Sequence, residues 1–248
     1  MDVPQFLMGI GSMIAGLSSL RTAFKSPGKI PAHRTASRHG RGVRGLGRLE
    51  LTGSMTNGTD ASSKIYKVNN IDERLAGVAR QMMASIRDPR VRQLAVSVVS
   101  RRARKADVNS GDGGWAIEER DYWNEVKAIF NWMRANVRYI RDMATIDTFA
   151  TAMRTIEAHG GDCDDYTIAL GALLMSIGYS VRMKTIQTKD SDDWNHIYLQ
   201  VGLPPGKPMK WRTLDASVAQ PAGWEAPSTI IGKARVDAPD DPKWNKYF

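Results

Sequence analysis

The sequence lacks the long apolar run that a membrane-spanning helix requires. No stretch of its 248 residues reaches the roughly 18 consecutive apolar residues needed to cross a bilayer as a helix. The segment from Phe6 to Leu20 comes closest, but it follows Asp2 instead of a basic region and has no small-residue cleavage site. We therefore expect neither a transmembrane segment nor a signal peptide.

Acidic and aromatic residues are missing from a stretch near the N-terminus. Arg21 to Arg48 contains eight basic residues and no acidic ones, and no aromatic residue occurs between Phe24 and Tyr66. Removing these eight from the chain's 35 basic residues leaves 27 against 26 acidic residues, so the net charge of +9 lies almost wholly here. We expect a flexible basic arm over residues 25–64, which is either a solvated linker or a binder of polyanions. Nucleic acid would be held through phosphate contacts, because no aromatic side chain is available to stack on bases.

The first 24 residues have a helical pattern in front of this arm. Bulky apolar residues recur at helical spacing at Phe6, Ile10, Met13, Leu17, Leu20 and Phe24. Small residues line another face, which permits close helix contacts. A helix over residues 1–24 could pack on its own domain, on other subunits or on a membrane surface. We favour a protein partner.

The chain has one cysteine, Cys163, at the point where a loop becomes a helix. Gly160, Gly161 and Asp162 precede it, and an apolar run from Ile168 to Met175 follows. A thiol at a helix N-terminus faces free backbone N–H groups, so its pKa tends to fall and its thiolate becomes available as a nucleophile. The structural alternative is a small buried hydrophobic residue.

Two strands downstream supply the other groups that a cysteine nucleophile needs. Residues 194–201 alternate as a half-buried strand with His196 near its start, and residues 211–216 form a second strand ending near Asp215. A connection rich in proline and glycine favours antiparallel neighbours. A cysteine nucleophile needs a base for its proton and a third group to orient that base. Cys163, His196 and Asp215 are therefore our candidates for a catalytic triad.

Three neighbours of these residues are candidates to line the site: Asp162, Trp194 and Asn195. Trp194, beside the base, would shield the site from water or simply pack. Asp164 and Asp165 complement the helix macrodipole, but their charge opposes thiolate formation. His196 would then have to offset that charge by an ion pair with the thiolate.

Metal binding is the rival chemistry for the acidic residues. A single cysteine beside carboxylates lacks the paired Cys and His spacing of zinc sites, and the acidic residues at 190–193 lack the spacing and glycine of a calcium loop. We expect no metal and no cofactor.

Helical periodicity fills the region between the arm and the cysteine. Apolar stripes predict helices from Ile71 to Ile86, from Pro89 to Val99 and from Glu118 to Asn136, with a short helix over residues 149–156. Residues 138–141 are expected to be extended. The tail from Gln220 has no clear periodicity, and its tryptophans favour packing over its own domain or a neighbouring subunit.

The three candidate motifs together resemble the transglutaminase-like cysteine peptidase superfamily. Its pattern is a Gly-x-Cys motif opening a helix, then a His on one strand and an Asp on the next. The matching stretches are Gly161-Asp162-Cys163-Asp164-Asp165, Asn195-His196-Ile197-Tyr198 and Leu214-Asp215-Ala216-Ser217. The run from Ile71 to about Gly223 is similar to the variant often encoded by bacteriophages and prophages. Asp88-Pro89-Arg90-Val91-Arg92, Val137-Arg138-Tyr139-Ile140-Arg141-Asp142 and the acidic residues around Cys163 resemble that variant.

The resemblance implies a papain-like α+β domain with helices packed on an antiparallel sheet, which we place at residues 65–225, followed by a C-terminal tail over residues 226–248. It implies acyl transfer on a peptide, protein or peptidoglycan substrate, leaving protease, peptidoglycan hydrolase and transglutaminase open. The phage-like variant implies a virion or tail-associated protein, located in the virion or in the host cytoplasm before assembly. The N-terminal helix, arm and tail would then contact other virion subunits. The alternative is a structural assembly protein that keeps the fold as a scaffold.

Overall fold

The structure is a computed structural model that describes residues 64–66, 70–102, 114–141 and 147–247. The predicted helix over residues 1–24 and all but the last residue of the predicted arm lie outside these residues. Among the helices of the described residues, none is long and apolar enough to cross a membrane.

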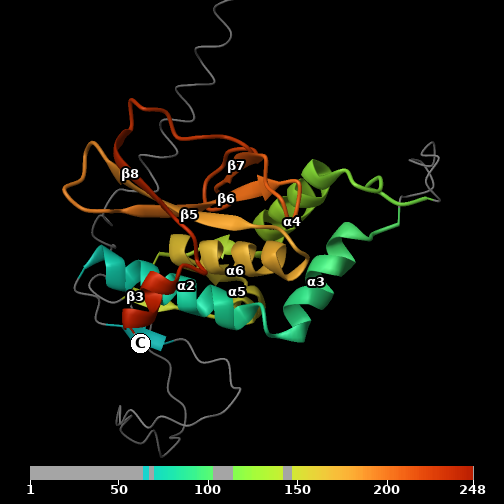
Figure 1. The fold of residues 1–248 in the computed structure, drawn as a ribbon, viewed down its shortest axis with the longest axis horizontal. Helices are drawn as coiled ribbons and strands as arrows, with labels where there is room; N and C mark the ends of the chain where they lie inside the picture. Colours follow the sequence, from blue (N-terminus) through green and yellow to red (C-terminus); the bar gives the residue numbers. More distant parts are fainter. Residues whose placement is uncertain (1–63, 67–69, 103–113, 142–146, 248) are drawn as a thin grey trace, which may run out of the picture.

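Four antiparallel strands form the sheet that carries two of the candidate residues. In spatial order they are β7 (Lys210–Leu214), β6 (His196–Leu203), β5 (Val181–Thr188) and β8 (Ile231–Asp237) (Figure 1). β6 and β7 are antiparallel neighbours, as predicted, with Leu199 opposite Leu214. Because His196 opens β6 and Asp215 follows β7, this register brings the two residues to the same end of the strand pair.

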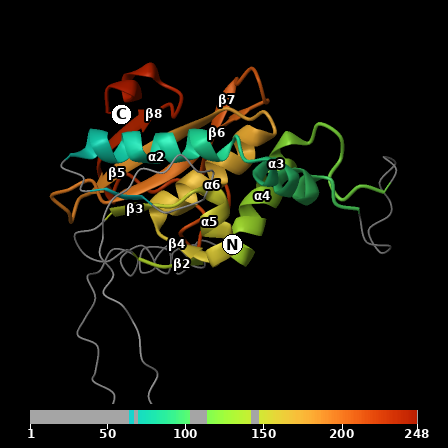
Figure 2. The ribbon, with the colours of Figure 1, turned by 90° about the horizontal axis from the view of Figure 1, so that it is seen from below.

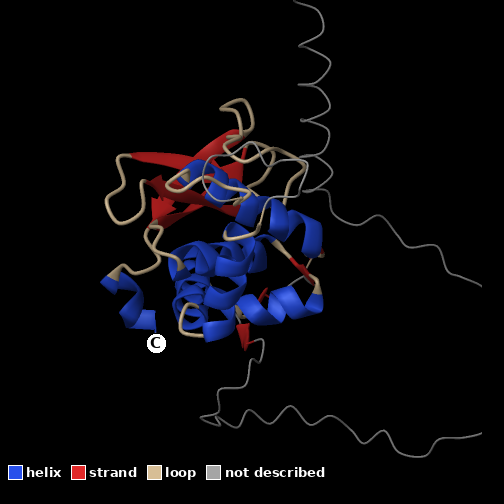
Figure 3. Cartoon of the chain, turned by 90° about the vertical axis from the view of Figure 1, so that its right-hand side faces the viewer, coloured by secondary structure: helices blue, strands red, loops and turns tan. Residues whose placement is uncertain are grey.

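The helix that begins at the cysteine, α6 (Cys163–Ser176), lies at the centre of the domain. All of its residues from Cys163 to Leu174 are buried. The sheet packs against α6, and four further helices contact it: α2 (Ile71–Ser85), α3 (Pro89–Val99), α4 (Tyr122–Asn136) and α5 (Ala152–Ala158). Figure 2 labels these helices beside α6, and Figure 3 shows the sheet on one side of the helices. This burial on all sides explains why the helix sequence is continuously apolar. The predicted α+β architecture, with helices packed on an antiparallel sheet, is confirmed.

Polar caps start the first two helices where the sequence predicts. At the start of α2, Asn70 Oδ1 accepts a hydrogen bond of 3.0 Å from the backbone N–H of Glu73. At the start of α3, Asp88 Oδ1 accepts one of 2.9 Å from the backbone N–H of Arg90. Pro89 occupies the first position of α3, where the lack of an N–H costs nothing.

The next two helices start later than predicted. α4 begins at Tyr122 rather than near residue 118, because Asp121 is its N-cap and accepts from the backbone N–H of Asn124 at 3.2 Å. α5 begins at Ala152 after the cap Thr151. The preceding residues belong to β3 (Asp147–Phe149), which pairs with β1 (Lys64–Tyr66).

A short parallel strand pair leads directly into α6. β2 (Arg138–Tyr139) lies beside β4 (Gly160–Gly161), with Tyr139 opposite Gly161. The backbone N–H of Ile140 donates to the carbonyl of Gly161 at 2.8 Å. The predicted extended segment after α4 is therefore anchored two residues before Cys163.

The C-terminal segment is part of the sheet and the core. β8 pairs with β5, and η2 (Pro242–Tyr247) packs against α2 with Trp244 buried. Arg235 Nη1 also donates to Asp72 Oδ1 of α2 at 2.6 Å. The predicted tail over residues 226–248 therefore includes the last strand of the sheet, and the predicted boundary at residue 225 comes too early. β8 gives little sequence signal because, as an edge strand, it is mostly exposed.

Candidate active site

Cys163 is the first residue of α6 and is 6% exposed. Asp162 caps the helix, and its Oδ1 accepts from the backbone N–H groups of Asp164 at 3.0 Å and Asp165 at 3.1 Å. Gly161 has no room for a side chain, since a Cβ there would lie 2.6 Å from Asp165 Cβ. The glycine and the capping aspartate thus fix the turn that delivers the thiol to the start of the helix.

His196 and Asp215 form a buried pair, each 5% exposed. His196 Nε2 and Asp215 Oδ2 are 2.6 Å apart. The other carboxylate oxygen, Oδ1, accepts from the hydroxyl of Ser217 at 2.7 Å and from its backbone N–H at 3.2 Å. Asp215 is therefore held from both sides, and it in turn fixes the orientation of the His196 ring.

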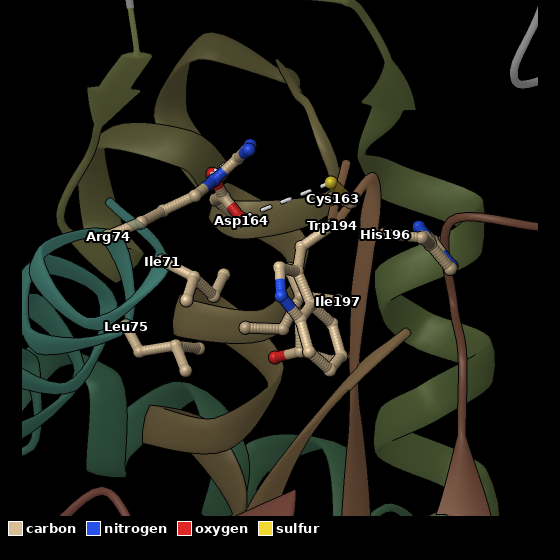
Figure 4. Close-up of a pocket in the computed structure, with 9 residues that line it drawn as sticks. Ile71, Arg74, Leu75, Cys163, Asp164, Trp194, His196 and Ile197 are labelled. Atoms are coloured by element: carbon tan, nitrogen blue, oxygen red, sulfur yellow. Dashed lines mark hydrogen bonds and ion pairs between the residues drawn. The ribbon is translucent and has the colours of Figure 1, made fainter. Parts of the chain in front are cut away.

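Cys163 and His196 line one pocket between α2 and the sheet. The other lining residues are Ile71, Arg74, Leu75, Asp164, Thr185, Trp194 and Ile197. Figure 4 shows Cys163 between Asp164 and His196, and the side chains of Ile71 and Leu75 on the opposite side from Trp194. The sequence-predicted cysteine and histidine therefore share a cavity, and the aspartate contacts the histidine from behind.

The surroundings of Cys163 raise the pKa of its thiol well above the ordinary value. Burial is the main cause, and the negative charges of Asp164 and Asp162 act in the same direction. The Arg74 guanidinium and a hydrogen bond from the backbone of Ile197 act in the opposite direction but do not compensate. The expected lowering of the thiol pKa by the helix N-terminus is therefore wrong for this resting state, because burial outweighs the macrodipole.

The carboxylates that follow Cys163 have protein partners. Asp164, which is almost fully buried, accepts from Arg74 Nη2 at 2.8 Å and from Arg74 Nε at 3.0 Å. Its other oxygen lies 4.0 Å from Cys163 Sγ, a long S–H···O contact. Asp165 accepts from the backbone N–H of Ala150 at 2.9 Å. Within the described residues, no group of three or more His, Cys, Asp or Glu side chains is placed to hold a metal ion.

Trp194 and Asn195, the two residues before His196 that were predicted to line the site, have different surroundings. Trp194 lines the pocket. Asn195 instead joins the two ends of the β5–β6 connection: its Oδ1 accepts from the backbone N–H of Thr188 at 3.0 Å, and its Nδ2 donates to Thr188 Oγ1 at 2.7 Å. Asn195 thus holds the turn before His196.

Several residues near the thiol were not singled out from the sequence. Arg74 and Thr185 line the pocket, and the apolar stripe of α2 supplies Ile71 and Leu75. Arg74 lies on the same helical face as this stripe, three residues after Ile71, and that spacing is the signal that could have identified it. Tyr139 lies beside the turn, opposite Gly161, and burial together with the negative charge of Asp162 raises the pKa of its hydroxyl.

Residues 114–216 match the family model of the transglutaminase-like superfamily. This part of the chain is a transglutaminase-like domain. It contains all three candidate triad residues, whereas α2, with Arg74, and the edge strand β8 lie outside the matched residues.

Two solved structures to which the chain is similar are both of bacterial proteins. A candidate cysteine protease from Cytophaga hutchinsonii has 18% sequence identity and a TM-score of 0.37, over 61% of this chain and 49% of that one. A candidate protease from Parabacteroides distasonis has 11% identity and a TM-score of 0.40, over 62% of this chain and 32% of that one. The chain thus spans about half and about a third of their lengths. No curated protein matches the chain.

Proposed function

We propose that the chain is a cysteine hydrolase that cleaves a peptide or amide bond through an acyl-enzyme on Cys163. The observation that supports this function best is the buried His196–Asp215 pair, 2.6 Å apart, beside a pocket that Cys163 also lines. A buried ionisable pair is expensive to maintain in a fold that only needs packing. A catalytic role for His196 and Asp215 would explain why the fold keeps this buried pair.

The resting thiol is neutral in this mechanism. Asp215 accepts the Nε2 hydrogen of His196, so Nδ1 carries the lone pair and acts as the base. As Sγ attacks the carbonyl carbon, its proton passes to Nδ1. The resulting imidazolium, stabilised by Asp215, then protonates the leaving amine as the C–N bond breaks. Water hydrolyses the thioester with His196 again as base, and an amine in place of water would give transamidation.

The developing oxyanion needs hydrogen-bond donors near Sγ. The backbone N–H of Cys163 lies at the positive end of α6 and is the first candidate. We assign the second role to the hydroxyl of Tyr139. Tyr139 lies opposite Gly161 in the β2–β4 pair, and Gly161 is two residues before Cys163.

The hydrolase assignment is tested with the full-length chain on a casein-type protein, purified peptidoglycan, and a glutamine peptide with a labelled amine. We expect one of these to turn over, and Cys163→Ala and His196→Ala to abolish turnover. His159→Ala is the matched control, because His159 caps α5 and bonds to the Asn136 carbonyl outside the pocket. Turnover that survives Cys163→Ala, or a wild type inert on all three, would remove the proposal.

The phage-like motifs and the basic arm indicate a role in virion assembly in addition to hydrolysis. We propose a virion or tail-associated protein whose N-terminal helix, arm and C-terminal segment bind other virion subunits, with nucleic acid as a further partner of the arm. The stretch from Arg21 to Arg48, most of which lies in the arm, has eight basic and no acidic residues, which favours this assembly role. Size-exclusion chromatography of the full chain and of a chain starting at Ser63, at low and high salt, tests it. Salt-sensitive association should be confined to the full chain.

A further inference from the structure

Thr185 has a buried hydroxyl without a hydrogen-bond partner. The residue lies on β5 and is 3% exposed. Among the described residues, its Oγ1 is the buried side-chain oxygen that neither donates nor accepts a hydrogen bond. An unpaired buried hydroxyl destabilises a fold, and valine has almost the same shape without that cost. The hydroxyl of Thr185 therefore keeps its hydrogen-bonding capacity for a partner from outside the chain.

The place of Thr185 indicates where such a partner would come from. Thr185 lines the same pocket as Cys163 and His196. Its neighbours in that pocket include Ile71 and Leu75 of α2 and Ile197, which lies opposite it on β6. Their aliphatic side chains offer no hydrogen bond, so the hydroxyl is available to a group that enters beside the thiol.

The pocket also limits the size and charge of that group. Its enclosed part has room for about one water-sized group. The two charged side chains in its lining, Arg74 and Asp164, are bound to each other at 2.8 Å. A small uncharged group fits, whereas an aromatic ring would have to displace Trp194 or the start of α2.

Building on the proposed hydrolase function, we propose that this pocket is the specificity pocket for the acyl side of the substrate. It takes a small side chain that bears a hydroxyl, a serine, near the scissile bond. The serine hydroxyl bonds with Thr185 Oγ1, and its methylene contacts Ile71 and Ile197. The hydroxyl that is unpaired in the free protein thus gains its partner in the complex.

The test uses binding, so that it does not depend on turnover. The full-length Cys163→Ala protein is titrated with capped, fluorescent hexapeptides that carry Gly, Ala, Ser, Val or Phe at each position in turn. At one position we expect serine to bind about fivefold more tightly than alanine, the gain of one hydrogen bond. Adding Thr185→Val should remove this preference. Equal binding of the serine and alanine peptides, a preference for Phe, or no binding of any peptide would overturn the proposal.

A stability measurement separates a substrate role from a structural one. Thr185→Val should keep or raise the melting temperature, because it removes an unpaired hydroxyl and keeps the shape. Thr155→Val is the matched control: Thr155 is equally buried, but its hydroxyl donates to the carbonyl of Thr151 at 3.3 Å. This control should lower the melting temperature and leave the peptide preference unchanged. A lower melting temperature for Thr185→Val would reveal a structural partner, such as a trapped water, and overturn the proposal.

The outcomes for the pocket and for the hydrolase are distinguishable. Turnover by the wild type without a serine preference contradicts only the proposed specificity pocket. A serine preference that depends on Thr185, in a wild type that turns over none of the library peptides, contradicts only the proposed hydrolase function.

Discussion

Arg74 Nη2 lies 2.8 Å from Asp164 Oδ2, and this ion pair joins α2 to the residue that follows the candidate nucleophile. Ninety residues separate the two in the chain. Asp164 is almost fully buried and its charge disfavours the thiolate of Cys163, whereas the Arg74 charge favours it. The ion pair therefore anchors α2 to the start of α6 and also affects the electrostatic environment of the thiol.

Arg74→Ala should raise the pKa of the Cys163 thiol further, because it removes a positive charge that favours the thiolate. Alkylation of Cys163 by iodoacetamide at a fixed pH should become slower than in the wild type. Loss of the ion pair to the buried Asp164 carboxylate should also lower the free energy of unfolding by about 1–3 kcal/mol, less than for a fully buried pair because Arg74 is 26% exposed.

Arg90→Ala is the control for this variant. Arg90 pairs with Asp88 and Glu157 on the surface, so its loss should change the free energy of unfolding little and should not change the alkylation rate. Faster alkylation of Arg74→Ala than of the wild type would contradict the electrostatic argument.

Cys163 should react slowly with iodoacetamide at pH 7, opposite to what a thiol at a helix N-terminus suggests. Burial and the nearby carboxylates raise the pKa of this thiol, so little thiolate exists at neutral pH. The chain has one cysteine, so the extent of labelling by mass spectrometry reports on Cys163 alone. The protein in urea, with its thiol exposed, is the reference. A rate at pH 7 above that of the unfolded chain would refute the raised pKa.

The same shift makes the fold less stable in alkali. Below about pH 9, the thiol is protonated in both folded and unfolded chains, so its contribution to the free energy of unfolding is fully present. Above that pH the unfolded chain loses the proton first, so the free energy of unfolding falls as the pH rises. Tyr166, whose pKa burial raises to about 12, adds a loss of the same sign above about pH 10. Urea midpoints at pH 7, 9 and 10.5 should therefore decrease in that order.

Local patterns allowed much of this fold to be predicted. The caps at Asn70 and Asp88 and the apolar run of α6 are encoded within a few residues, and the starts of these helices were found at those places. The adjacency of β6 and β7 followed from their short connection. Family resemblance supplied the order of Cys163, His196 and Asp215, whose joint role as a triad stays a prediction.

Long-range contacts account for what the sequence did not reveal. The partner of Asp164 comes from another helix, and no local pattern announces such a pair. The raised pKa of the thiol depends on its burial in the folded domain, which is a tertiary property. The sequence did not predict β8, because its mostly exposed residues lack the alternation of a half-buried strand. This strand nevertheless completes the sheet beside Thr185.

Trp244→Ala should destabilise the domain by about 3–5 kcal/mol, because it opens a cavity where η2 packs on α2. The free energy of unfolding from urea titration measures this loss. Trp115→Ala is the control, since Trp115 is 38% exposed and its described contact is with Arg102. It should cost about 1 kcal/mol or less. Equal effects of the two substitutions would mean that the C-terminal segment is not part of the core.

Tyr139→Phe should lower kcat about 10²-fold with little change in KM, as expected for a donor that bonds to the oxyanion in the transition state. The substrate is whichever one the wild type turns over. Tyr179→Phe is the matched control: its hydroxyl donates to Glu125 Oε2 at 2.5 Å, away from the pocket. That substitution should reduce stability and leave kcat unchanged. An unchanged kcat in Tyr139→Phe would move the oxyanion role to another group.

Asp215→Asn tests the role of the aspartate in setting the tautomer of His196. An asparagine has nearly the same shape, but its amide can donate to Nε2 in place of accepting from it. The ring hydrogen would then move to Nδ1, which could no longer take the proton of Cys163. We expect kcat to fall about 10³-fold with KM nearly unchanged, because Asp215 contacts the ring from behind the pocket.

Two comparisons make this last measurement decisive. Asp192→Asn, at an exposed aspartate in the β5–β6 connection, makes the same chemical change and should leave kcat as in the wild type. A urea titration of Asp215→Asn checks that the fold survives, since the hydroxyl of Ser217 still has an oxygen to donate to. If a folded Asp215→Asn protein keeps full kcat, the aspartate does not orient the base, and the His196–Asp215 contact is structural.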